Sequence, residues 1–463
     1  SIFKKSFSSA PTDAIDYWAL YFNTVMDEKS AKRNFHLAQV FVNAPGKRFG
    51  VLTNMKSGVP IDEVLAFAKT DVERANVHVV YAVRNRGRGL STLKTVQKLD
   101  PQNPLLDYLL IREVNKIEDW VLTPRYTNFD PTMDPRGGTY GVSNELIQER
   151  IKDDEAYALE IAKWIRSLKL TSENTTWRIT EAHLSGISGL SSVAYELLQG
   201  INNSDDELAS LVDQLKLLYK VRANAEGLLV PEERELLMNA KQANHNLFLF
   251  AVSREYEFQK KLDIAAGLFS RVNVSADYYA EGVSWRSGTG KATLESDYYY
   301  SWFLYLDAEY TPEELKSVID FAQVKFEESS TFDKWQRENL RMSIDRLYDL
   351  LGTKYIRQNN MGNAIAAFEN VGSDLWKGYP YETYLNGNPF HADFYSGHKP
   401  SEQDTIRYTK LELAKQYNVY SDMAENPKTK NRAYYYFLLA NCELNMSHYG
   451  NSWMMRRYFW TRS

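Results

Sequence analysis

The stretch YDLLGTKYIRQNNMGNAIAAFENV, residues 348–371, carries the pattern that decides the fold. Apolar and aromatic residues recur every three or four positions on both sides of the polar run Asn359-Asn360, which is typical of two helices joined by a turn. Small residues stand at Gly352 and Ala364, where helices can cross closely, and Phe368 offers a large ring to fill the gap between them. The stretch therefore predicts a packed pair of helices.

The same spacing occurs at two other places in the chain. Gly352, Ala364, Phe368 and Val371 are separated by 12, 4 and 3 positions. Two further sets of small, small, large and apolar residues repeat these separations: Ser253, Ala265, Phe269 and Val272, and Ala182, Ala194, Leu198 and Ile201. Three copies predict that the helix pair is a repeated unit.

This pattern resembles the tetratricopeptide (TPR) repeat, a helix–turn–helix unit of about 34 residues. Seven residues match its signature positions: Tyr348, Leu351, Gly352, Tyr355, Ala364, Phe368 and Val371. The resemblance implies an all-α, TPR-like α-solenoid of antiparallel helix pairs, here with long aromatic-rich loops. Residues 434–444 resemble the first helix of one further pair, and the second helix of that pair would span residues 451–459. Another all-helical bundle is the alternative.

Helical periodicity extends through much of the chain. It covers residues 144–168, 206–225, 232–259, 311–328 and 334–358. We expect degenerate helical repeats over residues 1–142, TPR-like helical pairs over 143–272, and TPR-like pairs with aromatic loop insertions over 273–463.

Local signals support these helices. Thr311, Pro312 and Glu314 form a helix start with a capping side chain. The β-branched runs at residues 39–42 and 77–83 fit either a strand or a buried turn of helix, and we favour helix.

Composition narrows the function classes. The chain has 463 residues and a net charge of −5, which argues against nucleic-acid binding. We find no apolar run long enough to span a membrane. Cys442 is the single cysteine, so an intrachain disulfide and a multi-cysteine metal site are excluded. The basic cluster Arg84-Asn85-Arg86-Gly87-Arg88 is interpreted as a solvated loop between helices.

Aromatic residues make up 13% of the chain and gather in irregular stretches at residues 122–142, 273–296 and 372–401. Rings at repeat positions are explained by packing, but rings outside them are not. Because Tyr and Trp are enriched where proteins bind partners, we predict a partner surface from Tyr278, Tyr279, Trp285, Tyr298, Trp302, Trp376, Tyr379, Tyr381, Tyr384, Phe390 and Tyr395.

No catalytic, cofactor or metal site can be named from the sequence. Residues 286–293 resemble a phosphate loop, but Trp285 stands where its first Gly belongs and Ala292 where Ser or Thr should bind magnesium. His391 and His398 are interpreted as a pair of loop histidines that, together with Asp393, bind no metal. Ser185 to Gly189 lies at the turn of a helical repeat, whereas a nucleophile elbow follows a strand. Paired acids such as Asp153-Asp154-Glu155 are interpreted as solvated helix faces.

We therefore predict a non-enzymatic scaffold that binds partner proteins, as a subunit of a larger bacterial cell-envelope assembly. The dense Tyr, Trp and Asn content with TPR-like helices is similar in style to envelope proteins of Bacteroidota, including SusD-like nutrient-binding lipoproteins. That similarity implies glycan binding at the outer membrane as one alternative; an enzyme on a helical toroid is another. We expect a periplasmic or outer-membrane-associated location, with the cytoplasm left open.

Overall fold

The computed structural model describes residues 11, 13–26, 30–127, 130–136, 143–168, 170, 174–201, 206–224, 229–239, 245–272, 301–325, 329–378, 381–385, 387–391, 406–447 and 450–458. Every regular element in these ranges is a helix, so the predicted all-α class is confirmed. The chain divides into two compact units, Ser1–Ala225 and Glu226–Ser463, and each is described by itself. None of the helices in the described ranges has the length and apolar character of a membrane span.

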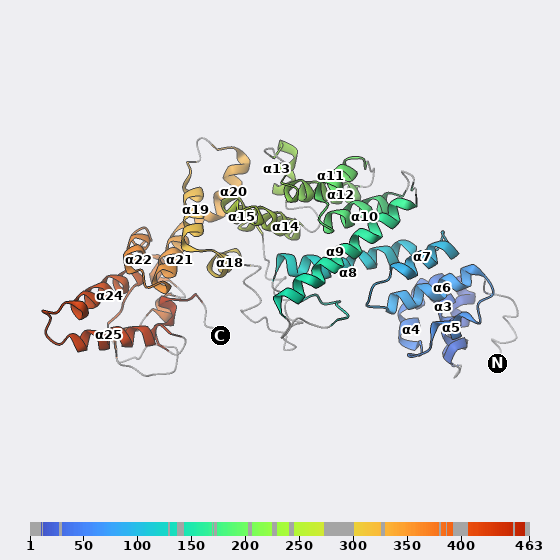
Figure 1. Cartoon of the computed structure of the whole chain (residues 1–463), viewed down its shortest axis with the longest axis horizontal. Helices are drawn as coiled ribbons and strands as arrows, with labels where there is room; N and C mark the ends of the chain where they lie inside the picture. The colour runs from blue at the N-terminus through green and yellow to red at the C-terminus, as the bar shows by residue number, and fades with distance from the viewer. Residues whose placement is uncertain are drawn as a thin grey trace. The chain divides into compact units, whose positions relative to one another are not determined.

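Unit 1 is a series of helices with mostly short connections (Figure 1). Their bounds are α2 (Ala14–Val25), α3 (Ser30–Asn43), the 3-10 turn η1 (Pro45–Lys47), α4 (Arg48–Asn54), α5 (Ile61–Leu65), α6 (Asp71–Arg84), α7 (Leu90–Leu99), α8 (Leu106–Tyr126), α9 (Asn144–Ser167), α10 (Thr175–Ile187), α11 (Ser191–Gln199) and α12 (Asp206–Arg222).

Both β-branched runs are helical, as favoured. Residues 39–42 belong to α3, and residues 77–83 belong to α6. Helix α6 begins with a capping box, in which Glu73 N donates to Thr70 Oγ1 (3.2 Å) and Thr70 N donates to Glu73 Oε2 (3.0 Å). Val77, Val79 and Val80 are completely buried. Tertiary packing therefore outweighs the weak helix propensity of valine.

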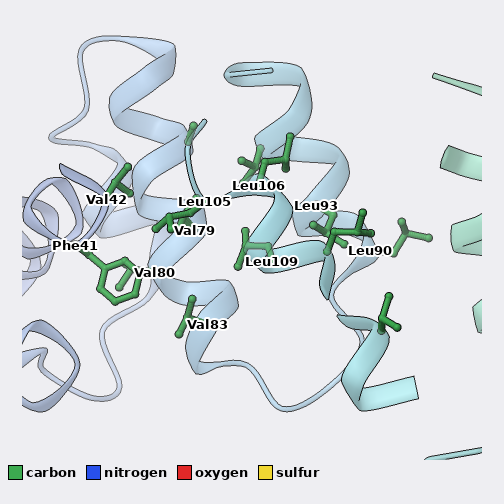
Figure 2. Close-up of a cluster of buried hydrophobic side chains, with 14 of the residues drawn as sticks. Phe41, Val42, Val79, Val80, Val83, Leu90, Leu93, Leu105, Leu106 and Leu109 are labelled. Atoms are coloured by element: carbon green, nitrogen blue, oxygen red, sulfur yellow. The ribbon is translucent and has the colours of Figure 1, made fainter. Parts of the chain in front are cut away.

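The core of unit 1 includes the region where α3, α6, α7 and α8 meet (Figure 2). Phe41 and Val42 come from α3, and Val80 and Val83 from α6. Leucines of α7 and α8 cover the other side of α6: Leu90, Leu93, Leu106 and Leu109.

A buried carboxylate joins α8 to the start of α7. Glu113 Oε1 accepts the hydroxyl of Tyr157 (2.6 Å) and the backbone N–H of Gly89 (2.8 Å), and Glu113 also pairs with Lys116. Gly89 must be small there, because a β-carbon would lie 2.7 Å from Glu113 Oε2. The burial of these groups raises the pKa of the Tyr157 hydroxyl, and the Glu113 charge raises it further. The hydroxyl is therefore a neutral donor that fixes α9 against this junction.

Unit 2 is also helical. Its elements are α13 (Pro231–Met238), α14 (His245–Phe258), α15 (Leu262–Phe269), α18 (Trp302–Glu309), α19 (Pro312–Gln323), α20 (Thr331–Met342), α21 (Ile344–Arg357), α22 (Met361–Phe368), η2 (Leu375–Lys377), α23 (Tyr381–Tyr384), α24 (Lys410–Glu425), α25 (Arg432–Asn445) and η3 (Trp453–Met455).

Two helices predicted as continuous are split. The segment 232–259 contains α13 and α14, because the chain leaves the helical region at Asn239 (φ −83°, ψ 84°). The segment 334–358 contains α20 and α21, which are divided at Ser343 (φ −106°, ψ 18°). The predicted start of α19 is confirmed, since Thr311 and Glu314 form a capping box behind Pro312. Helix α19 ends at Gln323, earlier than predicted.

The terminal pair differs from the prediction. Helix α25 packs against α24, which precedes it, and the expected second helix over residues 451–459 is wrong for its described part. That part contains only the short turn η3, and Trp453, Met454 and Met455 of this turn are buried in the core of unit 2. The Tyr458 hydroxyl then donates to Asp349 Oδ2 (2.8 Å), which holds the segment back against α21.

The three sets of spaced residues all coincide with pairs of packed helices: α10 with α11, α14 with α15, and α21 with α22. Each pair turns through one residue in the left-handed region: Gly189 (φ 90°), Lys260 (φ 62°) and Asn359 (φ 57°). The same backbone hydrogen bond closes each turn: Leu190 N to Ser185 O (3.0 Å), Lys261 N to Tyr256 O (3.0 Å) and Asn360 N to Tyr355 O (2.9 Å). This is one helix-ending motif used three times at equivalent positions.

The irregular stretches are only partly described. Helix α8 continues through Leu122 to Tyr126, and residues 130–136 follow without regular structure. Asp119 of α8 holds them, since its Oδ2 accepts from Met133 N (2.7 Å). The stretch 273–296 lies outside the described residues. The stretch 372–401 contains η2 and α23 within its described part.

Candidate functional site

The eleven aromatic residues predicted as a partner surface fall into two groups. Outside the described residues lie Tyr278, Tyr279, Trp285, Tyr298, Tyr379 and Tyr395. In the described group, Trp376, Tyr381 and Phe390 are buried, while Trp302 and Tyr384 are half-buried. The three buried rings contribute to the core of unit 2 and offer no open face to a partner.

Trp376 and Tyr381 donate to one buried carboxylate. The Trp376 indole N–H donates to Asp349 Oδ1 (2.9 Å), and the Tyr381 hydroxyl donates to Asp349 Oδ2 (3.1 Å). The same Oδ2 accepts from Lys410 Nζ (3.0 Å) and from the Tyr458 hydroxyl (2.8 Å). Asp349 therefore gathers α21, η2, α23, α24 and the C-terminal segment at one point.

The charges of this cluster are closed off from solvent. The side chains of Asp349 and Lys410 both have 0% exposure. Burial lowers the pKa of Lys410, and the charge and hydrogen bond of Asp349 oppose that effect. Lys410 Nζ also donates to Thr353 Oγ1 (2.8 Å) and lies 4.4 Å from the centre of the Tyr458 ring. With its polar atoms paired inside the protein, the cluster is a structural joint.

Phe390 belongs to a second internal junction. Its ring meets those of Tyr408 and Tyr420 edge to face, with centroids 5.5 Å and 4.9 Å away. Asn445 Nδ2 of α25 donates to the carbonyl oxygens on either side of Phe390, those of Pro389 (2.9 Å) and His391 (2.8 Å). The described part of this loop is thus fixed to α25.

The motifs considered for chemistry have structural partners where they are described. Ser185 Oγ donates to Glu181 O (2.7 Å) within α10, and the expected turn of the repeat follows at Ser188 and Gly189. The phosphate-loop-like residues 286–293, with Asp393 and His398, lie outside the described residues. Within the described ranges, no group of three His, Cys, Asp or Glu side chains is arranged to hold a metal ion.

The charged motifs of unit 1 also pair internally. The basic cluster lies between α6 and α7, as expected, and Arg88 pairs with Asp154 (3.0 Å). Asp154 also pairs with Arg136 (2.6 Å) and is only 2% exposed, so its interpretation as part of a solvated face is wrong. These two arginines tie the α6–α7 loop and the segment before α9 to one carboxylate of α9.

Helix α25 exposes large apolar side chains that the sequence analysis did not select. Tyr434 is 56% exposed, Tyr436 and Phe437 are each 49% exposed, and Leu444 is 45% exposed. No charged residue occurs from Ala433 through Cys442. That charge-free run was the signal available in the sequence.

Helix α2 exposes a second apolar face, again missed. Ile15 is 74% exposed, Trp18 45%, Phe22 50% and Met26 86%, and these positions recur at helical spacing. Lys47 Nζ lies 4.2 Å from the centre of the Trp18 ring and 4.7 Å from that of Phe22. We name Ile15, Trp18, Phe22 and Met26 the α2 face.

Comparison of the chain with models of protein families, with curated proteins and with solved structures finds no match in any of the three.

Proposed function

We propose that the chain is a non-enzymatic, TPR-like helical-repeat scaffold that binds partner proteins. Three helix pairs with the same turn and the same spacing of small and large residues support a repeated unit. The stacking of such units into a solenoid of antiparallel pairs is part of this proposal. Solenoids present extended surfaces, which suits them to binding other proteins.

The α2 face is the observation that carries the proposal. Ile15, Trp18 and Phe22 lie in one stripe of α2, Met26 follows at its C-cap, and each of the four is at least 45% exposed. Monomeric soluble proteins rarely leave such contiguous patches uncovered. Aromatic residues and Met are enriched in the buried centres of protein interfaces, and Lys47 provides a cation at the side of the stripe. A partner with apolar side chains and an acidic rim fits this surface.

The test compares partner recovery between matched variants of the full chain. Trp18→Glu with Phe22→Glu places two charges within the α2 face. Val72→Glu is the control, because Val72 is 52% exposed on α6 of the same unit and lies in the first turn of that helix. We expect at least one protein to be recovered with the wild type and the control and lost with the double variant.

A protein selected in this way is then purified and mixed with the chain to confirm direct binding. The proposal fails if no recovered protein depends on the α2 face. Specific binding on a glycan array would favour the SusD-like alternative. The cell-envelope location stays a prediction from the sequence, and cell fractionation would test it.

A further inference from the structure

Helix α25 has the composition of a helix that is covered on all sides. Its only charged residues are Arg432 and Glu443, near the two ends. A helix that is apolar all round is normally buried. Helix α24 packs against α25, and Asn441, Cys442 and Asn445 are buried. The large side chains exposed on the rest of α25 therefore indicate a face that another helix covers.

Four exposed residues form one stripe along this face: Ala433, Phe437, Ala440 and Leu444. Their separations of 4, 3 and 4 positions keep them on a single side of the helix. Small and large side chains alternate along the stripe. We name these four residues the α25 stripe.

We propose that the α25 stripe packs against the α25 stripe of a second copy of this chain, with the two helices antiparallel about a two-fold axis. A single register places Phe437 opposite Ala440 of the second copy and, at the same time, Leu444 opposite Ala433. Both contacts join a large side chain to a small one, and the two-fold axis repeats each of them. Such alternation of large and small residues lets helices approach closely.

Two further features favour this register. It places Tyr436 beside Glu443 of the second copy, because residues seven positions apart lie on one flank of the stripe and the two-fold axis keeps each flank on its own side. The Tyr436 hydroxyl can then donate to the carboxylate, which already accepts from Tyr417 and pairs with Arg456. Tyr436 is 49% exposed, and the side chain of Glu443 is 38% exposed. Antiparallel helices also bring each positive N-terminal end beside a negative C-terminal end. The stripe is thus complementary to itself, which is what a two-fold interface requires.

The interface is small. Stable, specific interfaces bury at least about 1,200 Å² in total, and one pair of helix faces lies near or below that value. We therefore expect a dimer that dissociates on dilution. The α2 face takes no part in this contact, so the present proposal and the proposed function can fail independently.

The first test measures the molar mass of the full chain in solution at increasing protein concentration, by sedimentation and light scattering. We expect the mass to rise from that of one chain toward that of two. Phe437→Glu should remain monomeric at every concentration. Met342→Glu is the control, since Met342 is 73% exposed on α20, away from the stripe, and should still dimerise. A wild type that never dimerises, or a Phe437→Glu variant that still does, overturns the proposal.

The second test determines the register by disulfide formation. Positions 433 and 444 lie on the same helix about 16 Å apart, too far for a disulfide within one chain. The proposed register brings each of them beside the other position in the second copy. Ala433→Cys with Leu444→Cys should therefore give a covalent dimer under oxidation, whereas either single variant should not.

The native cysteine does not disturb this experiment. Cys442 has 0% exposure, and burial raises the pKa of its thiol, which suppresses the reactive thiolate. Covalent dimers from a single variant would show a different register and contradict the proposal. Their absence from the double variant, at concentrations where the wild type dimerises, would do the same. Phe437→Glu in the double-cysteine background should abolish the covalent dimer.

Discussion

The ring of Phe368 fills the space that a side chain at Gly352 would need. A β-carbon at position 352 would lie 2.3 Å from Cε1 of this ring, and both residues are buried where α21 and α22 cross. We expect Gly352→Ala to destabilise unit 2 by about 1–3 kcal/mol, because a ring in a packed core cannot move aside freely. Unfolding in urea, followed by circular dichroism, measures the change.

Gly362 provides the matched control for this substitution. It lies in α22 and is exposed, and the nearest atom to a new β-carbon would be Asn360 Oδ1 at 3.9 Å. Gly362→Ala should stabilise the protein by about 0.5–1 kcal/mol through the better helix propensity of alanine. Equal effects of both variants would contradict the packing argument.

Replacing one partner of the buried ion pair of unit 2 should destabilise the protein more than replacing both partners. Asp349→Asn leaves the Lys410 ammonium buried without its counter-ion, for which we expect a loss of about 3–5 kcal/mol in the free energy of unfolding. Lys410→Met should cost less, because three neutral donors still hold Asp349. The double variant should lose less than the sum of the single variants. A double-mutant cycle in urea tests this, and additive losses would argue against coupling.

Lys354 gives the stability of unit 2 a pH dependence. Burial lowers its pKa from 10.5 to about 8, while its ammonium donates to the carbonyl oxygens of Asp307 (2.6 Å) and Tyr310 (2.5 Å). Between pH 8 and 10.5 the unfolded chain binds more protons at this site than the folded chain, so stability rises with pH. The free energy of unfolding of the wild type, relative to Lys354→Met, should increase on the order of 1–2 kcal/mol from pH 7.5 to 9.5.

Urea unfolding at three or four pH values across this window measures the slope. The difference between the two proteins is the relevant quantity, because the other titrating groups are common to both. A difference that is flat or falls with rising pH would show that Lys354 keeps an ordinary pKa in the folded protein.

The repeated helix pairs could be predicted from the sequence because their signal is local. The separations between Gly352, Ala364 and Phe368 indicate two helices that cross closely and are joined by a single turn. The structure has α21 and α22 at these positions. The division between α13 and α14 could not be predicted in this way. The residues around Asn239 include no Pro or Gly, so the helical pattern continues through the break.

The role of the aromatic rings could not be predicted, because it depends on distant partners. Trp376 and Tyr381 donate to Asp349, which lies 27 and 32 positions earlier in the chain, and Lys410 reaches it from 61 positions later. No local pattern connects these residues.

Because the helix pairs share one turn, substitutions at two equivalent positions of that turn should change the stability of the protein in opposite directions. Gly189 (φ 90°) and Lys260 (φ 62°) both occupy the left-handed region. A β-carbon at Gly189 would meet nothing within 4 Å, so Gly189→Ala changes only the backbone preference and should destabilise the protein by about 1 kcal/mol. Lys260→Gly should stabilise it by up to about 1 kcal/mol, since glycine adopts this conformation without strain. Thermal and urea unfolding of both variants measure the two effects, and the same sign at both positions would contradict the equivalence of the turns.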